Sequence, residues 1–154
     1  MRKLCTFSAE NRSGLGVADD SRSIVASRAE SRCEYCRMHQ SLQGATFHIE
    51  HVIPRIRGGT SELDNLALAC PSCNLHKADR VSSSPDHASG TIALFHPRKD
   101  VWNDHFEWAD YQIVGKSDVG CMTIQLLDLN HERRIKIRQA EQLFGLFPPQ
   151  PPSD

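Results

Sequence analysis

The sequence predicts a small α+β protein. Two C-x-x-C pairs lie far apart in the chain, and the hydrophobic pattern between and just after them predicts a strand, a long loop, a second strand and a helix, in that order. Beyond the second pair, short β-like runs and two stretches with apolar residues at three-to-four spacing predict a lobe of strands and helices. The length of 154 residues suits one compact core with one modest additional lobe.

Four segments follow from this pattern. Residues 1–22 mix Ser, Gly, Asn and charged residues without an apolar period, which predicts a disordered N-terminal extension. Residues 23–80 hold both cysteine pairs and form the predicted core, and residues 81–147 form the C-terminal lobe packed on it. Residues 148–154 are rich in proline and should be an extended tail.

The core elements are predicted from local patterns. Residues 23–32 have apolar positions near helical spacing and a serine available as a cap, so we expect a short helix that leads into the first cysteine pair. Residues 45–53 are β-branched and aromatic with alternating polarity, which predicts a half-exposed strand. After a glycine-containing loop, the apolar run 66–69 predicts a second strand. Pro71 suits the first turn of a helix that runs to residue 79.

The C-terminal lobe starts with a polar turn. The tract 81–90 contains proline, aspartate and glycine, and residues 91–95 then read as a returning strand. Two short β-like runs fall within residues 105–116. Residues 119–129 and 132–144 each carry a helical apolar period. The basic residues of the second of these helices fit a phosphate-binding face or an ordinary solvated face equally well.

The composition is that of a globular protein with a small core. Apolar residues make up 39%, charged residues 24% and aromatic residues 6% of the chain, and the formal net charge is −1. Bulk charge therefore gives no indication of a nucleic-acid partner, and any such interpretation must come from local residues. No stretch approaches the roughly 18 apolar residues of a membrane span, and no signal peptide is recognisable, so we expect a cytoplasmic protein without a membrane partner.

The spacing of four cysteines predicts a structural zinc site. In a cytoplasmic chain cysteines stay reduced, and a two-residue gap lets one tight turn present two thiolates to a tetrahedral ion. The pairs are Cys33 with Cys36 and Cys70 with Cys73. A redox role for one pair is the alternative, but the βαβ context of such motifs is absent. The stretch between the pairs exceeds the roughly 15 to 20 residues of a zinc ribbon, so the insert must have another role.

The insert and second knuckle together, residues 47–80, resemble the HNH endonuclease family. The matching motifs are Glu50-His51, the loop I-P-R-x-R-G-G at 53–59, Asp64-Asn65-Leu66, and C-x-x-C-N-x-x-K from Cys70 to Lys77. The resemblance implies a ββα-metal core, also called a His-Me finger, in the zinc-stabilised branch of the family. Weaker similarity to small bacterial stand-alone HNH proteins covers about residues 24–147.

Phosphodiester hydrolysis needs a base, a cation and groups that hold the backbone, and the insert offers each. His51 is the candidate general base, because the ordinary imidazole pKa is close to neutral pH. Glu50 and Asn74 offer hard oxygen ligands that suit a catalytic Mg²⁺ or Mn²⁺. The resemblance implies that Asn65 is a structural member of the motif that ties the long loop and orients the base. Glu50 and Asn74 replace the Asp and His of other members, and both keep an oxygen ligand.

Several further residues are weaker candidates. Lys77 follows Asn74 by one helical turn and could reach a phosphate oxygen, as could Arg55, Arg57 and Arg80. Ordinary surface charge explains the three arginines equally well. His48 should share the strand face of Glu50, where it would be a third metal ligand or a partner of one, and a plain surface histidine is the alternative.

The sequence thus predicts a metal-dependent endonuclease whose substrate is double-stranded DNA. Two other interpretations remain open. The first is a zinc-stabilised module that binds nucleic acid or protein without cleaving it, and the second is a thiol-based redox protein, which requires one C-x-x-C pair to be free.

Overall fold

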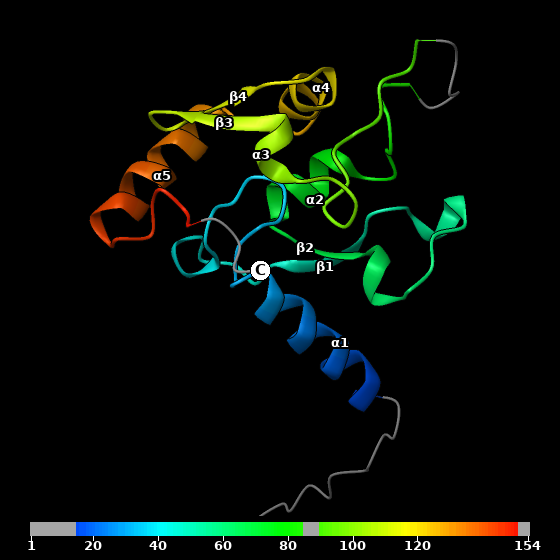
Figure 1. Ribbon diagram of the computed structural model, residues 1–154. Coiled ribbons are helices and arrows are strands. Elements are labelled where there is room, and N and C mark those ends of the chain that lie inside the picture. Colours follow the sequence, from blue (N-terminus) through cyan, green and yellow to red (C-terminus); the bar gives the residue numbers. More distant parts are fainter. Residues whose placement is uncertain (1–14, 85–89, 151–154) are drawn as a thin grey trace, which may run out of the picture.

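The computed structural model describes residues 15–84 and 90–150, and within them small sheets and helices are combined, which confirms the predicted α+β class (Figure 1). The predictions for residues 1–14 and for the last four residues of the tail lie outside the described residues. The helices are α1 (Leu15–Arg28), α2 (Pro71–Lys77), α3 (Trp102–His105), α4 (Asp118–Leu126) and α5 (Glu132–Leu143), the strands are β1 (His48–His51), β2 (Leu66–Ala69), β3 (Phe106–Ala109) and β4 (Gln112–Gly115), and the 3-10 turns are η1 (Gln40–Leu42), η2 (Arg55–Arg57) and η3 (Leu63–Asn65).

The strand–loop–strand–helix order of the core is confirmed. β1 and β2 pair antiparallel, with Glu50 opposite Ala67 and His51 opposite Leu66. β1 is shorter than the predicted 45–53, while β2 has the predicted bounds and is buried at all four positions. α2 follows directly, with Cys70 as its N-cap and Pro71 in its first turn, and ends at Lys77, two residues earlier than expected.

Helix α1 begins at Leu15 and ends at Arg28, so the prediction of disorder is wrong for residues 15–22, and the predicted helix 23–32 starts earlier and ends earlier. This helix is fixed to the core by arginine side chains, which local apolar spacing does not reveal. Arg22 donates to the carbonyl of Phe47 at 2.7 Å, and Arg28 donates to the carbonyls of Leu63, at 2.9 Å, and Leu66. The arginines thus connect α1 to the residue directly before β1, to η3 and to the first residue of β2.

The C-terminal lobe contains the two predicted β-like runs, which pair as a hairpin, and the two predicted helices. β3 and β4 pair antiparallel, and α4 and α5 lie within the predicted ranges 119–129 and 132–144, apart from one residue at the start of α4. The predicted strand 91–95 is wrong, because only an isolated bridge between Ser82 and Ala93 forms there. The hydroxyl of Ser83 accepts the hydrogen bond of the Ile92 amide and so takes the place of a backbone rung.

One hydrophobic cluster joins core and lobe. It includes Val25 and Phe47 from the core and Phe95, Phe106 and Leu127 from the lobe. Apolar side chains from the two parts therefore bury one another, and the lobe stabilises the core. None of the described helices is long and apolar enough to cross a membrane.

Candidate active site and metal centre

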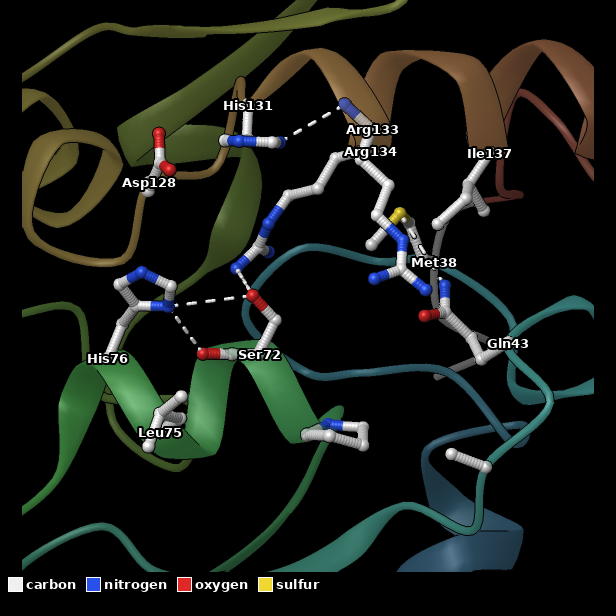
Figure 2. Close-up of a pocket in the computed structure, with 12 residues that line it drawn as sticks. Met38, Gln43, Ser72, Leu75, His76, Asp128, His131, Arg133, Arg134 and Ile137 are labelled. Carbon is white, nitrogen blue, oxygen red and sulfur yellow. Dashed lines mark hydrogen bonds between the residues drawn. The ribbon is translucent and has the colours of Figure 1, made fainter.

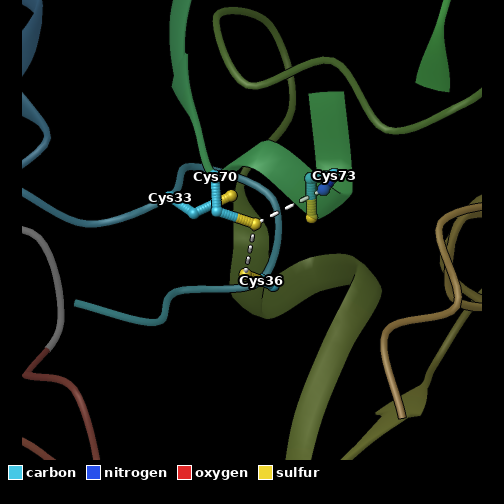
Figure 3. A group of neighbouring side chains, drawn as sticks. All are labelled: Cys33, Cys36, Cys70 and Cys73. Carbon is cyan, nitrogen blue, oxygen red and sulfur yellow. Dashed lines mark hydrogen bonds between the residues drawn. The ribbon is translucent and has the colours of Figure 1, made fainter. Parts of the chain in front are cut away.

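The four paired cysteines converge on one point (Figure 3). Their side chains are fully buried, and the four sulfur atoms lie within 4.8 Å of one another. The sulfurs of Cys36 and Cys70 are 3.8 Å apart, which is the edge of a tetrahedron with metal–sulfur bonds of about 2.3 Å. None of the described cysteines forms a disulfide. The cluster therefore fits a structural zinc ion, and the arrangement leaves neither pair free in the way a redox motif requires.

Local backbone structure presents these thiols. In the first knuckle the amide of Arg37 donates to the carbonyl of Cys33 at 2.8 Å, and Arg37 has a left-handed φ of 62°. In the second knuckle Cys70 is the N-cap of α2, and its sulfur accepts from the amide of Cys73 at 3.3 Å. Each knuckle is therefore a tight turn that directs two sulfurs to the same side.

An arginine of the C-terminal lobe also contacts the cluster. Arg134, on α5, donates from Nη1 to the sulfur of Cys73 at 3.1 Å and from Nη2 to Ser72 Oγ at 2.8 Å. Its side chain is almost fully buried, and a cavity of about 470 Å³ between α2 and α5 lies beside it (Figure 2). A positive charge at this position offsets the negative charge of four thiolates around a divalent ion. The basic stretch of α5 is thus partly a zinc-site element, which the sequence did not indicate.

Glu50 is held in a buried ion pair. Its carboxylate accepts from the hydroxyl of Tyr35 at Oε1, and Lys77 Nζ lies 3.2 Å from Oε2. The side chains of Lys77 and Glu50 are only 1% and 5% exposed. Burial raises the pKa of Glu50, although Lys77 and Tyr35 oppose this shift. Burial also raises the pKa of Tyr35 well above its ordinary value, so the phenol remains a donor to the carboxylate.

His51 is next to Glu50 on β1 and is half-buried at the edge of the sheet. Its Nε2 lies 3.0 Å from the hydroxyl of Ser61. Burial lowers the pKa of His51, and the charges of Arg55 and Lys77 lower it further. The imidazole is therefore neutral at pH 7 and able to accept a proton.

Asn65 is buried and closes the loop that follows β1. Its side chain accepts from the amide of Ile53 at 2.9 Å and donates to the carbonyls of Ile53, at 2.9 Å, and Thr60, at 2.8 Å. Gly59 fits beneath it, because a Cβ at this position would lie 1.7 Å from the carbonyl oxygen of Ile53. Asn65 thereby holds the loop segment that carries Ser61 to His51.

Two further predicted ligands lie nearby with fewer contacts. Asn74 is half-buried on α2, one residue after Cys73 of the four-cysteine cluster, and its side-chain amide makes no hydrogen bond with the described residues. His48, the first residue of β1, is exposed, and its ring likewise has no hydrogen-bond partner in the described part of the chain.

The predicted phosphate-binding residues separate into two groups. Lys77 differs from the prediction: it is buried, and its ammonium pairs with Glu50 and donates to the carbonyl of His51 at 3.3 Å. Arg55 and Arg80 are exposed. Arg57 is half-buried and donates from Nε to the carbonyl of Asp79 at 2.8 Å, which fixes its guanidinium beside the loop.

Tyr35, Ser61 and Arg134 contact the site, yet the sequence did not single them out. Tyr35 lies inside the first C-x-x-C knuckle, so its position between two zinc ligands was a usable signal. Ser61 and Arg134 carry no comparable signal, because their contacts depend on how the loop and α5 fold back.

Comparison with known families agrees with this geometry. Residues 33–80 match the sequence model of the HNH endonuclease family, and the matched segment contains both cysteine pairs together with Glu50, His51, Asn65 and Asn74. No curated protein and no solved structure matches the chain. The family match indicates a nuclease or another nucleic-acid-related function, and it confirms the resemblance seen in the sequence. Residues 33–80 of this chain are an HNH endonuclease family domain.

Proposed function

We propose that the protein is a metal-dependent endonuclease that hydrolyses phosphodiester bonds in double-stranded DNA, and that β1, β2 and α2 form a ββα-metal core. The observation that carries this proposal is the position of the His51 imidazole at the end of β1, held by Ser61 and directly after the fixed carboxylate of Glu50. Consecutive strand residues point to opposite faces, so a base and an anionic ligand can act on two sides of one phosphate.

In this proposal His51 accepts the proton of the attacking water. The hydroxyl of Ser61, 3.0 Å from Nε2, holds the ring in place, and Asn65 keeps the loop that carries Ser61 closed. A general base needs hydrogen bonds of this kind, which orient its ring and present one nitrogen to the substrate. Arg55 is exposed close enough to His51 to affect its pKa, and it is placed to contact a neighbouring phosphate.

Glu50 and Asn74 are the proposed ligands of the catalytic divalent ion, Mg²⁺ or Mn²⁺. Among the described residues, the four cysteines are the only group of three or more His, Cys, Asp and Glu side chains close enough to share an ion. A site with one carboxylate still suits Mg²⁺, which keeps several waters and binds substrate phosphates. When bound there, the ion would stabilise negative charge on the phosphate and on the leaving oxygen. His48 remains a proposed additional ligand, and we propose zinc for the four-cysteine cluster.

A plasmid assay tests the nuclease proposal. The zinc-loaded protein is incubated with supercoiled plasmid and Mg²⁺ or Mn²⁺, with EDTA as the metal-free control. We expect nicked or linear product that EDTA prevents and that His51→Ala lowers by at least about 100-fold, the typical contribution of a general base. His76→Ala is the matched control, because the hydrogen bonds of His76 in the described part of the chain go to Ser72 of its own helix. Equal activity of both variants would contradict the role of His51.

A non-cleaving nucleic-acid-binding module is the second candidate, and one observation favours it. Both oxygens of Glu50 already have partners, Tyr35 and Lys77, and the ammonium already balances the buried carboxylate charge. In this alternative Glu50 and Lys77 serve stability alone. Binding of labelled DNA without cleavage under Mg²⁺, Mn²⁺ and other divalent ions would support the module over the nuclease.

A further inference from the structure

A groove lies between the loop after β1 and the segment 93–100. The loop belongs to the HNH-matched residues 33–80, and the segment 93–100 lies outside them. The groove has a volume of about 660 Å³. Its apolar floor includes Ile53, Val81 and Leu94, and its polar lining is formed by Arg57, His96, Lys99 and Asp100. Ile53 and Arg57 belong to the loop after β1 that Asn65 closes, so the groove shares this loop with the proposed active site.

The outer wall of the groove is a rigid turn. The carbonyl of His96 accepts from the amides of Lys99, at 3.0 Å, and Asp100, at 2.9 Å, and the amide of His96 donates to the Asp100 carboxylate at 2.7 Å. Arg98 points the other way and forms an ion pair with Glu34 in the first zinc knuckle. The turn is therefore anchored to the first cysteine knuckle. The carboxylate of Asp100 accepts a hydrogen bond from the backbone of the turn.

The groups left to face a ligand are donors and cations. Lys99 is exposed and forms no ion pair within the described residues. The amide of Arg98 donates to Nδ1 of His96 at 3.2 Å, so the neutral ring carries its proton on Nε2 as a donor. Burial lowers the pKa of His96, and the charges of Lys99 and Lys77 lower it further, while Asp100 opposes the shift.

A second depression continues the path. It has a volume of about 320 Å³, shares Arg57 and Val81 with the groove, and adds the acidic Asp79, Arg80 and residues 82–84. Arg57 lies at the junction of the two, with its Nε bonded to the carbonyl of Asp79, and its terminal nitrogens have no partner within residues 15–84 and 90–150. Arg57 lines both depressions, Arg80 lines only the second and Lys99 only the groove, so together they offer three cationic side chains to a phosphodiester backbone.

We propose that this groove binds the sugar–phosphate backbone of a nucleic-acid strand beside the cleaved bond, with Arg57 and Lys99 on phosphates and Nε2 of His96 as a neutral donor. The assignment rests on the proposed function, which it extends by giving the C-terminal lobe a part in substrate binding. The apolar floor accommodates sugar or base surface, and the cationic lining favours nucleic acid over an apolar protein segment.

The test measures binding separately from cleavage. All variants are made in a His51→Ala background as full-length, zinc-loaded protein, and the anisotropy of a labelled 20-base-pair duplex is followed from 50 to 300 mM salt. For Lys99→Ala we expect about fivefold to tenfold weaker binding near 0.1 M salt and a slope of log K against log salt smaller by about one, because one phosphate contact is lost. Lys99→Arg should restore both values. His96→Asn, which keeps a donor and an acceptor, should weaken binding less than Lys99→Ala does.

The matched control is Lys136→Ala. Lys136 is an exposed lysine on α5 that is paired with Glu132, and its removal changes the net charge by the same amount. An equal effect of the two alanine variants would overturn the proposal, as would absence of duplex binding. Equal, Lys99-dependent binding of polyglutamate would also overturn it, since the groove would then select any polyanion. Lys99-dependent DNA binding without cleavage by the wild-type protein would uphold the groove and refute the nuclease.

Discussion

Replacing Lys77 with methionine tests whether the buried ion pair holds the candidate active site together. Methionine keeps most of the volume of the lysine stem but removes the ammonium, which lies 3.2 Å from Glu50 Oε2. The carboxylate, 5% exposed, would then have only Tyr35 as a side-chain partner. Breaking a buried pair by removing one charge costs about 3 to 5 kcal/mol of unfolding free energy. We expect a loss within this range for Lys77→Met.

Urea denaturation of the zinc-loaded protein measures the effect. Lys136→Met is the control, because Lys136 also pairs with a glutamate, Glu132, but the two side chains are 69% and 77% exposed. Loss of this exposed pair should cost at most about 1 kcal/mol of unfolding free energy. The double variant Lys77→Met/Glu50→Gln removes both charges and leaves an amide oxygen for Tyr35. It should recover roughly 2 kcal/mol or more relative to Lys77→Met alone. A loss no larger than that of the control, or additive costs in the double variant, would refute the buried-pair reasoning.

Three further predictions follow from groups around the site. If His51 is the general base, the cleavage rate should rise with pH to a plateau, and the midpoint of this rise should lie below the ordinary histidine pKa of about 6.5. The reason is that burial and nearby cations lower the pKa of His51. A midpoint above this value in a pH–rate profile would contradict the assignment. Gly59→Ala should lower the free energy of unfolding, measured by urea denaturation, by more than about 2 kcal/mol, because the new Cβ would lie 1.7 Å from the Ile53 carbonyl oxygen. Gly58→Ala is the comparison: Gly58 has a φ of 83° but open space around it, so this change should cost only about 1 to 2 kcal/mol. Glu141 is fully buried and burial raises its pKa from 4.5 to about 7, so the folded protein holds a proton that the unfolded chain releases and stability falls by about 3 kcal/mol as the pH rises through this window. Glu141→Gln should remove that part of the decline between pH 4.5 and 8, and a variant with the wild-type pH dependence would show that Glu141 is not its source.

The parts of the fold that sequence patterns predict well are those decided locally. Alternation in β1, the apolar run of β2 and the proline after Cys70 are properties of adjacent residues, and the structure has the predicted elements there. The convergence of four sulfurs was also predictable, because knuckle spacing and metal geometry leave few alternatives. The start of α1 was not, since this helix is fixed by arginine bonds to distant carbonyls.

The charged residues of the site show the same limit more sharply. At sequence level Lys77 is a helix-face lysine that could reach a phosphate, and the basic stretch of α5 reads as a surface. In the structure Lys77 is 1% exposed, and Arg134 and Arg138 are 3% and 0% exposed. A charged side chain is buried only where it contacts a counter-charge or polar partner from another part of the chain. Such contacts depend on the tertiary structure and cannot be seen in local sequence. Here the partners are Glu50 for Lys77 and the thiol of Cys73 for Arg134.

These buried contacts make the zinc centre and the candidate catalytic carboxylate one mechanical unit. Tyr35 lies between the ligands Cys33 and Cys36, and its hydroxyl donates to Glu50. Its neighbour Glu34 accepts from the amide of Leu68 at 2.8 Å, which fixes the knuckle to β2. Any displacement of the first knuckle must therefore move a hydrogen-bond donor of Glu50. Small structural metal sites contribute folding free energy directly, so the zinc proposed for this cluster would stabilise the chain and, through Tyr35, also help to position Glu50.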